Sequence, residues 1–128
     1  MHIIEHLRTE LIQLHSSLIE IENAARSIRK QILKIAIERG GCYLAQACSS
    51  ADIVASLYLE IMDLNPSQGV WDASPFPGVP GPDNMDYQKG ALYNGAPAPD
   101  KDRFFVSCCH YAAVIYSALV ATGRISPA

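Results

Sequence analysis

The chain has 128 residues, of which 49% are hydrophobic and 18% are charged. A chain of this length forms about one domain with a single sizeable core. Ten basic and thirteen acidic residues give a net charge of −3, and no basic patch marks a nucleic-acid-binding surface. The first residues lack the pattern of a signal peptide, and no apolar run approaches the roughly 20 residues of a membrane span. We therefore expect a cytoplasmic protein that binds neither nucleic acid nor membrane.

Residues 2 to 39 carry the pattern of one long helix. Apolar residues recur at alternating spacings of three and four, and neither proline nor glycine interrupts them before Gly40. This heptad seam consists of Ile4, Leu7, Leu11, Leu14, Leu18, Ile21, Ala25, Ile28, Ile32 and Ile35. Unbroken, the helix would span roughly 50 Å at about 1.5 Å per residue, more than one side of a small domain covers. The seam therefore either packs on the chain's own core after a kink near Asn23 or reaches a partner chain.

A second helix is predicted after the Gly40-Gly41 stop. Ser49, followed three residues later by Asp52, is typical of a capping box that opens a helix. Residues 52 to 62 are apolar on nearly every side, which predicts a buried helix that ends near Asn65-Pro66.

Residues 66 to 101 form a Pro-rich loop that holds seven of the eight prolines. Interleaved aromatic residues favour an ordered loop packed on a surface over a disordered tether. After the loop, residues 103 to 107 predict a short buried strand. Residues 111 to 122 predict a helix that ends at Gly123.

Cysteines and histidines are the remaining candidates for chemistry. Cys42, Cys48, Cys108 and Cys109 fall in two tight pairs, and we expect free thiols. Three thiolates with His110 would suit zinc, but their spacing matches no zinc ribbon or knuckle. His2, His6 and His15 have no acidic or cysteine partner at metal spacing and are interpreted as solvated. No metal site is predicted.

Two segments resemble the transketolase family. Residues 102 to 119 are similar to the family's Asp-Arg-Phe-Val-Leu-Ser stretch, which is followed by Lys-Gly-His and a helix that contains Ala and Tyr. Ala24-Ala25-Arg26-Ser27-Ile28-Arg29, Gly40-Gly41 and Ser49-Ser50-Ala51-Asp52-Ile53 are similar to the family's opening helices. The resemblance covers roughly residues 24 to 126 in order, apart from the enlarged loop.

The resemblance implies an α/β fold that is mostly helical in this chain. Residues 24 to 128 would form an incomplete thiamine diphosphate-binding domain, equivalent to the N-terminal section of a transketolase. Residues 1 to 23 would be an added N-terminal helical extension.

The resemblance also implies the site residues. Family members carry a histidine in the turn after the first helix and another in the turn after the strand, and both face the cofactor and the sugar. Here the second corresponds to His110, which is predicted to be catalytic and cofactor-binding, with Ser107 beside it as a further cofactor-binding residue. The first corresponds to Tyr43, and Tyr43 and Gln46 are the predicted substrate-binding residues. The family's Lys-Gly is replaced by Cys108-Cys109.

The family's diphosphate and magnesium segment, Gly-Asp-Gly, does not occur in this sequence. Thiamine diphosphate and Mg²⁺ would therefore be held mainly by partner chains that carry this segment and the pyrimidine domain. Two origins stay open: a subunit of a natural split enzyme, or an excised piece of a longer enzyme. With its partners, the chain would transfer a two-carbon ketol or related acyl unit. The alternative is a noncatalytic scaffold or regulatory subunit of such a complex.

Overall fold

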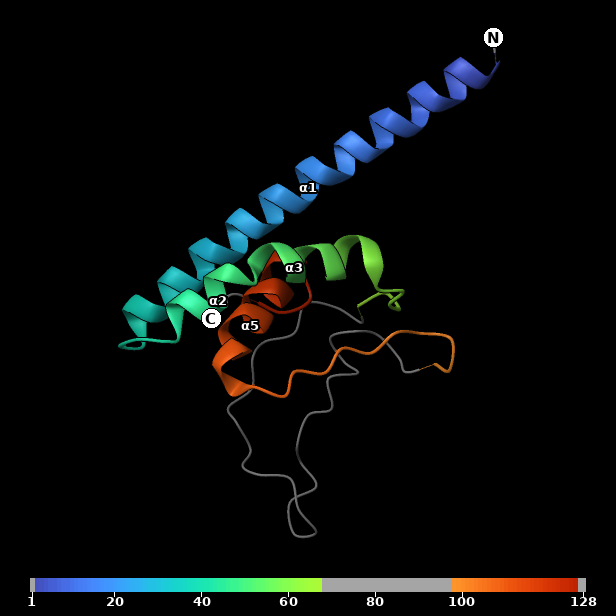
Figure 1. The fold of residues 1–128 in the computed structure, drawn as a ribbon. Coiled ribbons are helices and arrows are strands. Elements are labelled where there is room, and N and C mark those ends of the chain that lie inside the picture. The colour runs from blue at the N-terminus through green and yellow to red at the C-terminus, as the bar shows by residue number, and fades with distance from the viewer. Residues whose placement is uncertain (1, 68–97, 127–128) are drawn as a thin grey trace.

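The computed structural model describes residues 2–67 and 98–126. The Pro-rich loop predicted for residues 66 to 101 lies largely outside these described residues. The elements are α1 (His2–Glu38), α2 (Leu44–Ser49), α3 (Ala51–Ser56), a π-helical turn η1 (Leu57–Ile61), a 3-10 turn η2 (Cys109–Tyr111) and α5 (Ala112–Ala121). Figure 1 shows α1 as a long rod whose C-terminal half lies against α2, α3 and α5.

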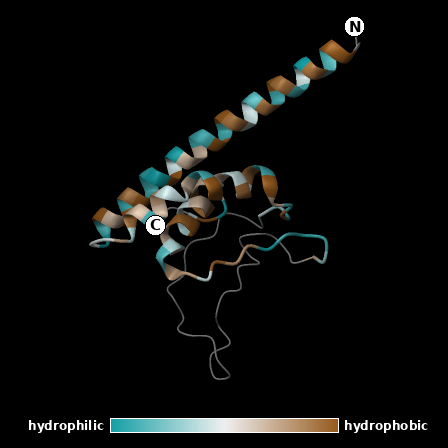
Figure 2. Cartoon of the chain, in the orientation of Figure 1, coloured by the Kyte–Doolittle hydropathy of each residue, from teal (hydrophilic) through white to brown (hydrophobic). Residues whose placement is uncertain are grey.

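Helix α1 is continuous through Asn23, so the kink considered there is absent. No proline or glycine lies within α1 to break it. The C-terminal part of the heptad seam is fully buried at Ala25, Ile28 and Ile32, whereas the part before Ile21 is exposed. In Figure 2, segments coloured as hydrophobic alternate with segments coloured as hydrophilic along this projecting half. One half of the same pattern therefore builds the core, and the other half has no cover within the described chain.

The core lies where α1, α3 and α5 meet. Its buried apolar residues are Ala25, Ile28, Ile32, Ala47, Ala51, Val54, Ala55, Tyr58, Val114, Ala118, Leu119 and Ile125. The many alanines allow helix backbones to approach closely. The one buried polar side chain among the described residues, Ser117, donates its hydroxyl hydrogen to the carbonyl oxygen of Ala113 at 2.7 Å. This bond avoids the cost of an unpaired buried hydroxyl. At the edge of the core, Arg29 on α1 forms an ion pair with Asp52 on α3.

Glycines end the first and the last helix, as the sequence predicts. Gly40 and Gly41 follow α1 with φ angles of 76° and 127°, and Gly123 follows α5 with φ of 69°. In this region of φ only glycine lacks a steric penalty. After α5, the N–H groups of Gly123 and Arg124 donate to the carbonyl oxygens of Val120 and Leu119 at 3.0 and 2.7 Å. These bonds satisfy carbonyl groups that the helix end would otherwise leave unpaired.

The helix predicted to begin near Ser49 forms as α3 and η1, which follow each other without a break over residues 51 to 61, but the predicted cap is absent. A further short helix, α2, precedes it, and no side-chain bond caps α3. The Ser49 and Ser50 hydroxyls both donate back to the carbonyl oxygen of Gln46, at 3.0 and 3.1 Å. Such local bonds compete with capping. The helix is also not buried on all sides, because the side chain of Ile53 is 64% exposed.

The predicted buried strand over residues 103 to 107 is also wrong. Residues 102 to 108 have no regular secondary structure, and the Phe105 side chain is 84% exposed. A strand requires the backbone N–H and C=O groups of a neighbouring strand, and none is present in residues 2–67 or 98–126. The mostly helical character is therefore confirmed, but the described residues show no sheet and nothing specific to a thiamine diphosphate-binding domain.

A polar cluster joins the two ends of the Pro-rich loop. The Lys101 ammonium contacts a carboxylate oxygen of Asp63 at 2.7 Å, and this hydrogen bond raises the pKa of Lys101. Asp63 donates its N–H to the Asp102 carboxylate, and Asp102 donates its N–H to the Asp63 carbonyl, both at 2.9 Å. The loop therefore leaves and rejoins the helices at one place.

None of the helices in the two described ranges has both the length and the apolar character needed to cross a membrane.

Shortening a core side chain of α1 should destabilise the fold. Ile32 is fully buried, and Ile37, five residues further along the same helix, is 80% exposed. Ile32→Ala should lower the free energy of unfolding by about 2 to 5 kcal/mol, because it leaves a cavity. The matched variant Ile37→Ala should change it by less than about 0.5 kcal/mol. Urea denaturation followed by circular dichroism measures both, and equal effects would contradict the described packing.

Candidate functional site

Two short turns that are far apart in the sequence meet at the candidate site. Tyr43 lies in the turn between α1 and α2, and His110 lies in η2, just before α5. Their ring centroids are 4.0 Å apart with an interplanar angle of 67°, an edge-to-face contact. Aromatic rings favour this geometry because the positive edge of one meets the negative face of the other.

The backbone on both sides fixes these two side chains. The carbonyl oxygen of Tyr43 accepts the Ala47 N–H at 3.0 Å, which ties Tyr43 to the first turn of α2. On the other side, Tyr111 donates its N–H to the Cys108 carbonyl at 3.2 Å and closes the η2 turn around His110. Because Ala47 and Val114 are buried in the common core, the two turns are held relative to each other.

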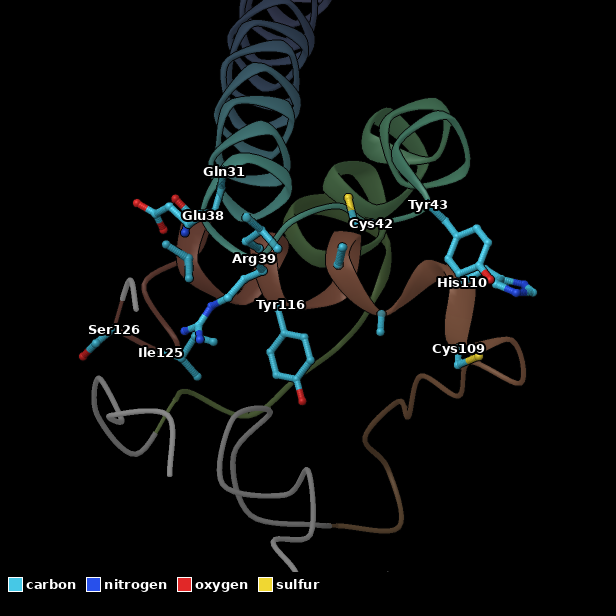
Figure 3. A pocket seen from close by; sticks show the side chains of 14 residues that line it. Gln31, Glu38, Arg39, Cys42, Tyr43, Cys109, His110, Tyr116, Ile125 and Ser126 are labelled. Carbon is cyan, nitrogen blue, oxygen red and sulfur yellow. The ribbon is translucent and has the colours of Figure 1, made fainter. Parts of the chain in front are cut away.

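A pocket of about 440 Å³ lies beside this contact. Figure 3 shows Tyr43 and His110 at one end, Glu38 and Ile125 at the other, and Arg39 and Tyr116 between them. The full lining is Gln31, Ile35, Glu38, Arg39, Cys42, Tyr43, Cys109, His110, Ala112, Ala113, Tyr116, Val120, Ile125 and Ser126. A mostly apolar wall with a few polar groups is typical of small-molecule sites.

His110 has a second close neighbour, the thiol of Cys108. The Cys108 sulfur lies 2.9 Å from Nδ1 of the imidazole. In one tautomer the S–H group donates to Nδ1, and Nε2 then carries the ring hydrogen. Within residues 2–67 and 98–126, no hydrogen-bond partner contacts Nε2. That nitrogen can therefore bind a ligand or exchange a proton with one.

The structure brings together two of the four predicted site residues, Tyr43 and His110. Gln46 is exposed on α2 and does not line the pocket. Ser107 is exposed and lines a different pocket, of about 290 Å³. Gln46 and Ser107 therefore both lie outside the candidate site.

Other lining residues were not identified from the sequence. Arg39 and Tyr116 add a guanidinium group and a hydroxyl group to the lining (Figure 3). Arg39 directly follows the last residue of α1, and a charged residue between a helix and the glycines that stop it is common, so its position gave no sign of a site. The Cys108–His110 contact was also not predicted. Two side chains that are two residues apart come into contact here only because the chain folds into the η2 turn.

The site does not fit a magnesium–diphosphate group. The described pocket lining has a single carboxylate, that of Glu38, whereas Mg²⁺ favours several oxygen ligands. Among the described residues, no group of three or more His, Cys, Asp or Glu side chains is placed to hold a metal ion. All four cysteines are free thiols. The arrangement can therefore bind a small organic group and move a proton, but it does not provide a metal site.

The chain is similar to the uncharacterised transketolase family protein y4mO of Sinorhizobium fredii, with 26% identity over 102 residues. The similar region covers 80% of this chain and 27% of that protein, so the chain spans about a quarter of its relative's length. No family model matches the chain, and no solved structure matches it. These findings give limited support to the resemblance seen in the motifs.

Replacing the Tyr43 ring should change the magnetic environment of His110. Tyr43→Leu removes the aromatic ring current and should shift the His110 ring-proton resonances in the NMR spectrum, whereas Tyr43→Phe should largely preserve them. Tyr116→Leu, which removes a ring elsewhere in the pocket, serves as the control. Equal His110 shifts in Tyr43→Leu and Tyr116→Leu would contradict the direct contact.

Proposed function

We propose that the chain is one subunit or section of a transketolase-like enzyme that transfers a two-carbon ketol or related acyl unit. The observation that carries this proposal is the contact between Tyr43 and His110 beside a pocket. The two positions were selected by resemblance to the two histidine-bearing turns of the family, and they are 67 residues apart in the sequence. Their meeting is the arrangement that the resemblance requires, and the similarity to a transketolase family protein supports the same class.

In this proposal His110 binds the reacting part of the substrate and transfers a proton. Its Nε2 can donate a hydrogen bond to a substrate oxygen or accept a proton from it near neutral pH. The Tyr43 hydroxyl provides a second donor in place of the family histidine. Thiamine diphosphate, which a partner chain would mainly hold together with Mg²⁺, would supply the carbanion sink for the transferred unit.

The exposed half of α1 supports the need for a partner. Before Ile21, the heptad seam presents Ile4, Leu7, Leu11, Leu14 and Leu18 to solvent. Burial of a large apolar side chain contributes roughly 1.5 to 3 kcal/mol, so covering this row would stabilise a complex by on the order of 10 kcal/mol. We propose that this half of α1 packs on the chain that carries the cofactor ligands.

The alternative proposal is a noncatalytic scaffold or regulatory subunit. It is favoured by the tyrosine at the first histidine position and by Cys108-Cys109 in place of Lys-Gly. Where the chain is a separate subunit, both proposals require a thiamine diphosphate-binding partner, and they differ in whether His110 takes part in the reaction.

Activity of the assembled complex distinguishes these two proposals. The chain would first be purified with its partners from the source cell, and the complex would then be rebuilt with His110→Ala. Loss of a positioned acid or base should lower kcat by about two to four powers of ten while assembly is retained. Tyr116→Phe, at the same pocket, should have a much smaller effect. Unchanged kcat in the His110→Ala complex would favour the scaffold, and absence of any thiamine diphosphate-binding partner would contradict both proposals.

A charge on the exposed seam should release the chain from its complex. Leu11 and Leu18 are 66% and 52% exposed in the chain alone, so Leu11→Asp with Leu18→Asp should leave its own folding unchanged. In the complex, each new carboxylate would be buried without a partner. Gel filtration at low micromolar concentration should show the double variant eluting separately.

The matched control is Thr9→Asp with Ser16→Asp, which adds the same charges at the same spacing on the opposite face of α1. This control should still elute with the partners. Retention of the Leu11→Asp, Leu18→Asp variant in the complex would show that the exposed seam is not the assembly surface.

A further inference from the structure

Cys108 and His110 form a thiol–imidazole pair that the proposed transfer reaction does not use. Their sulfur and Nδ1 atoms are 2.9 Å apart, within reach for direct proton transfer. Nucleophilic cysteines are activated by a neighbouring base that is itself oriented by a third group. Here the base is His110, and the Tyr43 ring packs against the imidazole from the other turn. The arrangement therefore places a base beside the thiol and an aromatic ring beside that base.

The thiol can be reached from a side that is separate from the candidate site. Cys108 is half-buried and lines the pocket of about 290 Å³, whereas His110 lines the pocket of about 440 Å³. The pocket at Cys108 has mainly apolar walls, among them Ile53, Leu57 and Phe105. Such walls favour a small uncharged reagent over a charged one, because a charge entering them loses its hydration.

We propose that Cys108 is a site of oxidation by hydroperoxides. The S–H proton moves to Nδ1 of His110, and the thiolate sulfur attacks one peroxide oxygen. The S–O bond forms as the O–O bond breaks, and the leaving oxygen takes the proton from the imidazole to leave as water or an alcohol. Sulfur loses two electrons and the peroxide gains them, so the product is a sulfenic acid at Cys108. This proposal does not depend on the transfer reaction.

The neighbouring cysteine provides an internal control. Cys109 is exposed and Cys108 is half-buried, so exposure alone predicts faster oxidation of Cys109. The purified, reduced chain would be treated with hydrogen peroxide in the presence of dimedone, which traps sulfenic acids. Fragmentation mass spectrometry of the peptide that contains both residues would assign the adduct. We expect Cys108 to react about tenfold faster than Cys109, or more, because only Cys108 has the imidazole at its sulfur.

A His110→Gln variant tests the role of the base. The amide retains hydrogen bonding but cannot take up a proton, so labelling of Cys108 should fall by about tenfold or more. The rates at Cys109 and at half-buried Cys42 should stay unchanged, and circular dichroism reports whether the variant is folded. If the variant does not fold, the relative labelling rates of Cys108 and Cys109 in the natural chain test the proposal. A Cys109 rate equal to or above that of Cys108, or a folded His110→Gln chain with unchanged Cys108 labelling, overturns the proposal.

Discussion

The burial of Ala25, Ile28 and Ile32 on α1 is the contact on which the rest of the structure depends. All three side chains are fully buried, and α1 contacts α3 and α5 more extensively than any other pair of helices does. The helices that face α1 present alanines such as Ala51 and Ala118. Short side chains allow close approach, and close approach maximises the dispersion contacts of the few large residues. Without α1, the short helices α2, α3 and α5 would lose their common surface.

The position of the candidate site follows from this contact. Gly40 and Gly41 adopt left-handed backbone conformations that turn the chain back at the end of α1, so that α2 begins beside the start of α5. Tyr43 and His110 each precede a helix, and the buried contact fixes both helices. The candidate site therefore forms where the N-terminal ends of α2 and α5 lie next to each other. A side chain at such a place is held by the first turn of its helix and still points away from the core.

The long helix, its glycine stop and the end of the last helix were predicted correctly. Both signals, the apolar periodicity and the backbone freedom of glycine, depend on residues that are close together in the sequence. Phe104, Phe105 and Val106 suggested a buried strand from their β-propensity, yet a strand depends on a neighbour that composition does not reveal. Ser49 does not cap the helix, because its hydroxyl donates to the carbonyl oxygen of Gln46. Tyr43 and His110 were identified from family motifs and not from periodicity. Their contact, like that of Cys108 with His110, depends on how the turns pack.

No residue lines both pockets, but the segment from Cys108 to Tyr116 contributes side chains to each of them. Cys108 faces the pocket that also contains exposed Phe105 and Ile53, and His110 faces the pocket with Tyr43. Exposed aromatic and branched apolar side chains are favourable surfaces for a partner chain. A partner seated on Phe105 would also close the route to the thiol, so oxidation at Cys108 and coverage of this surface would exclude each other. A sulfenic acid at Cys108 would keep a hydrogen-bond donor, now an O–H group, beside His110 Nδ1. The same tautomer, with the ring hydrogen on Nε2, would therefore be favoured before and after oxidation.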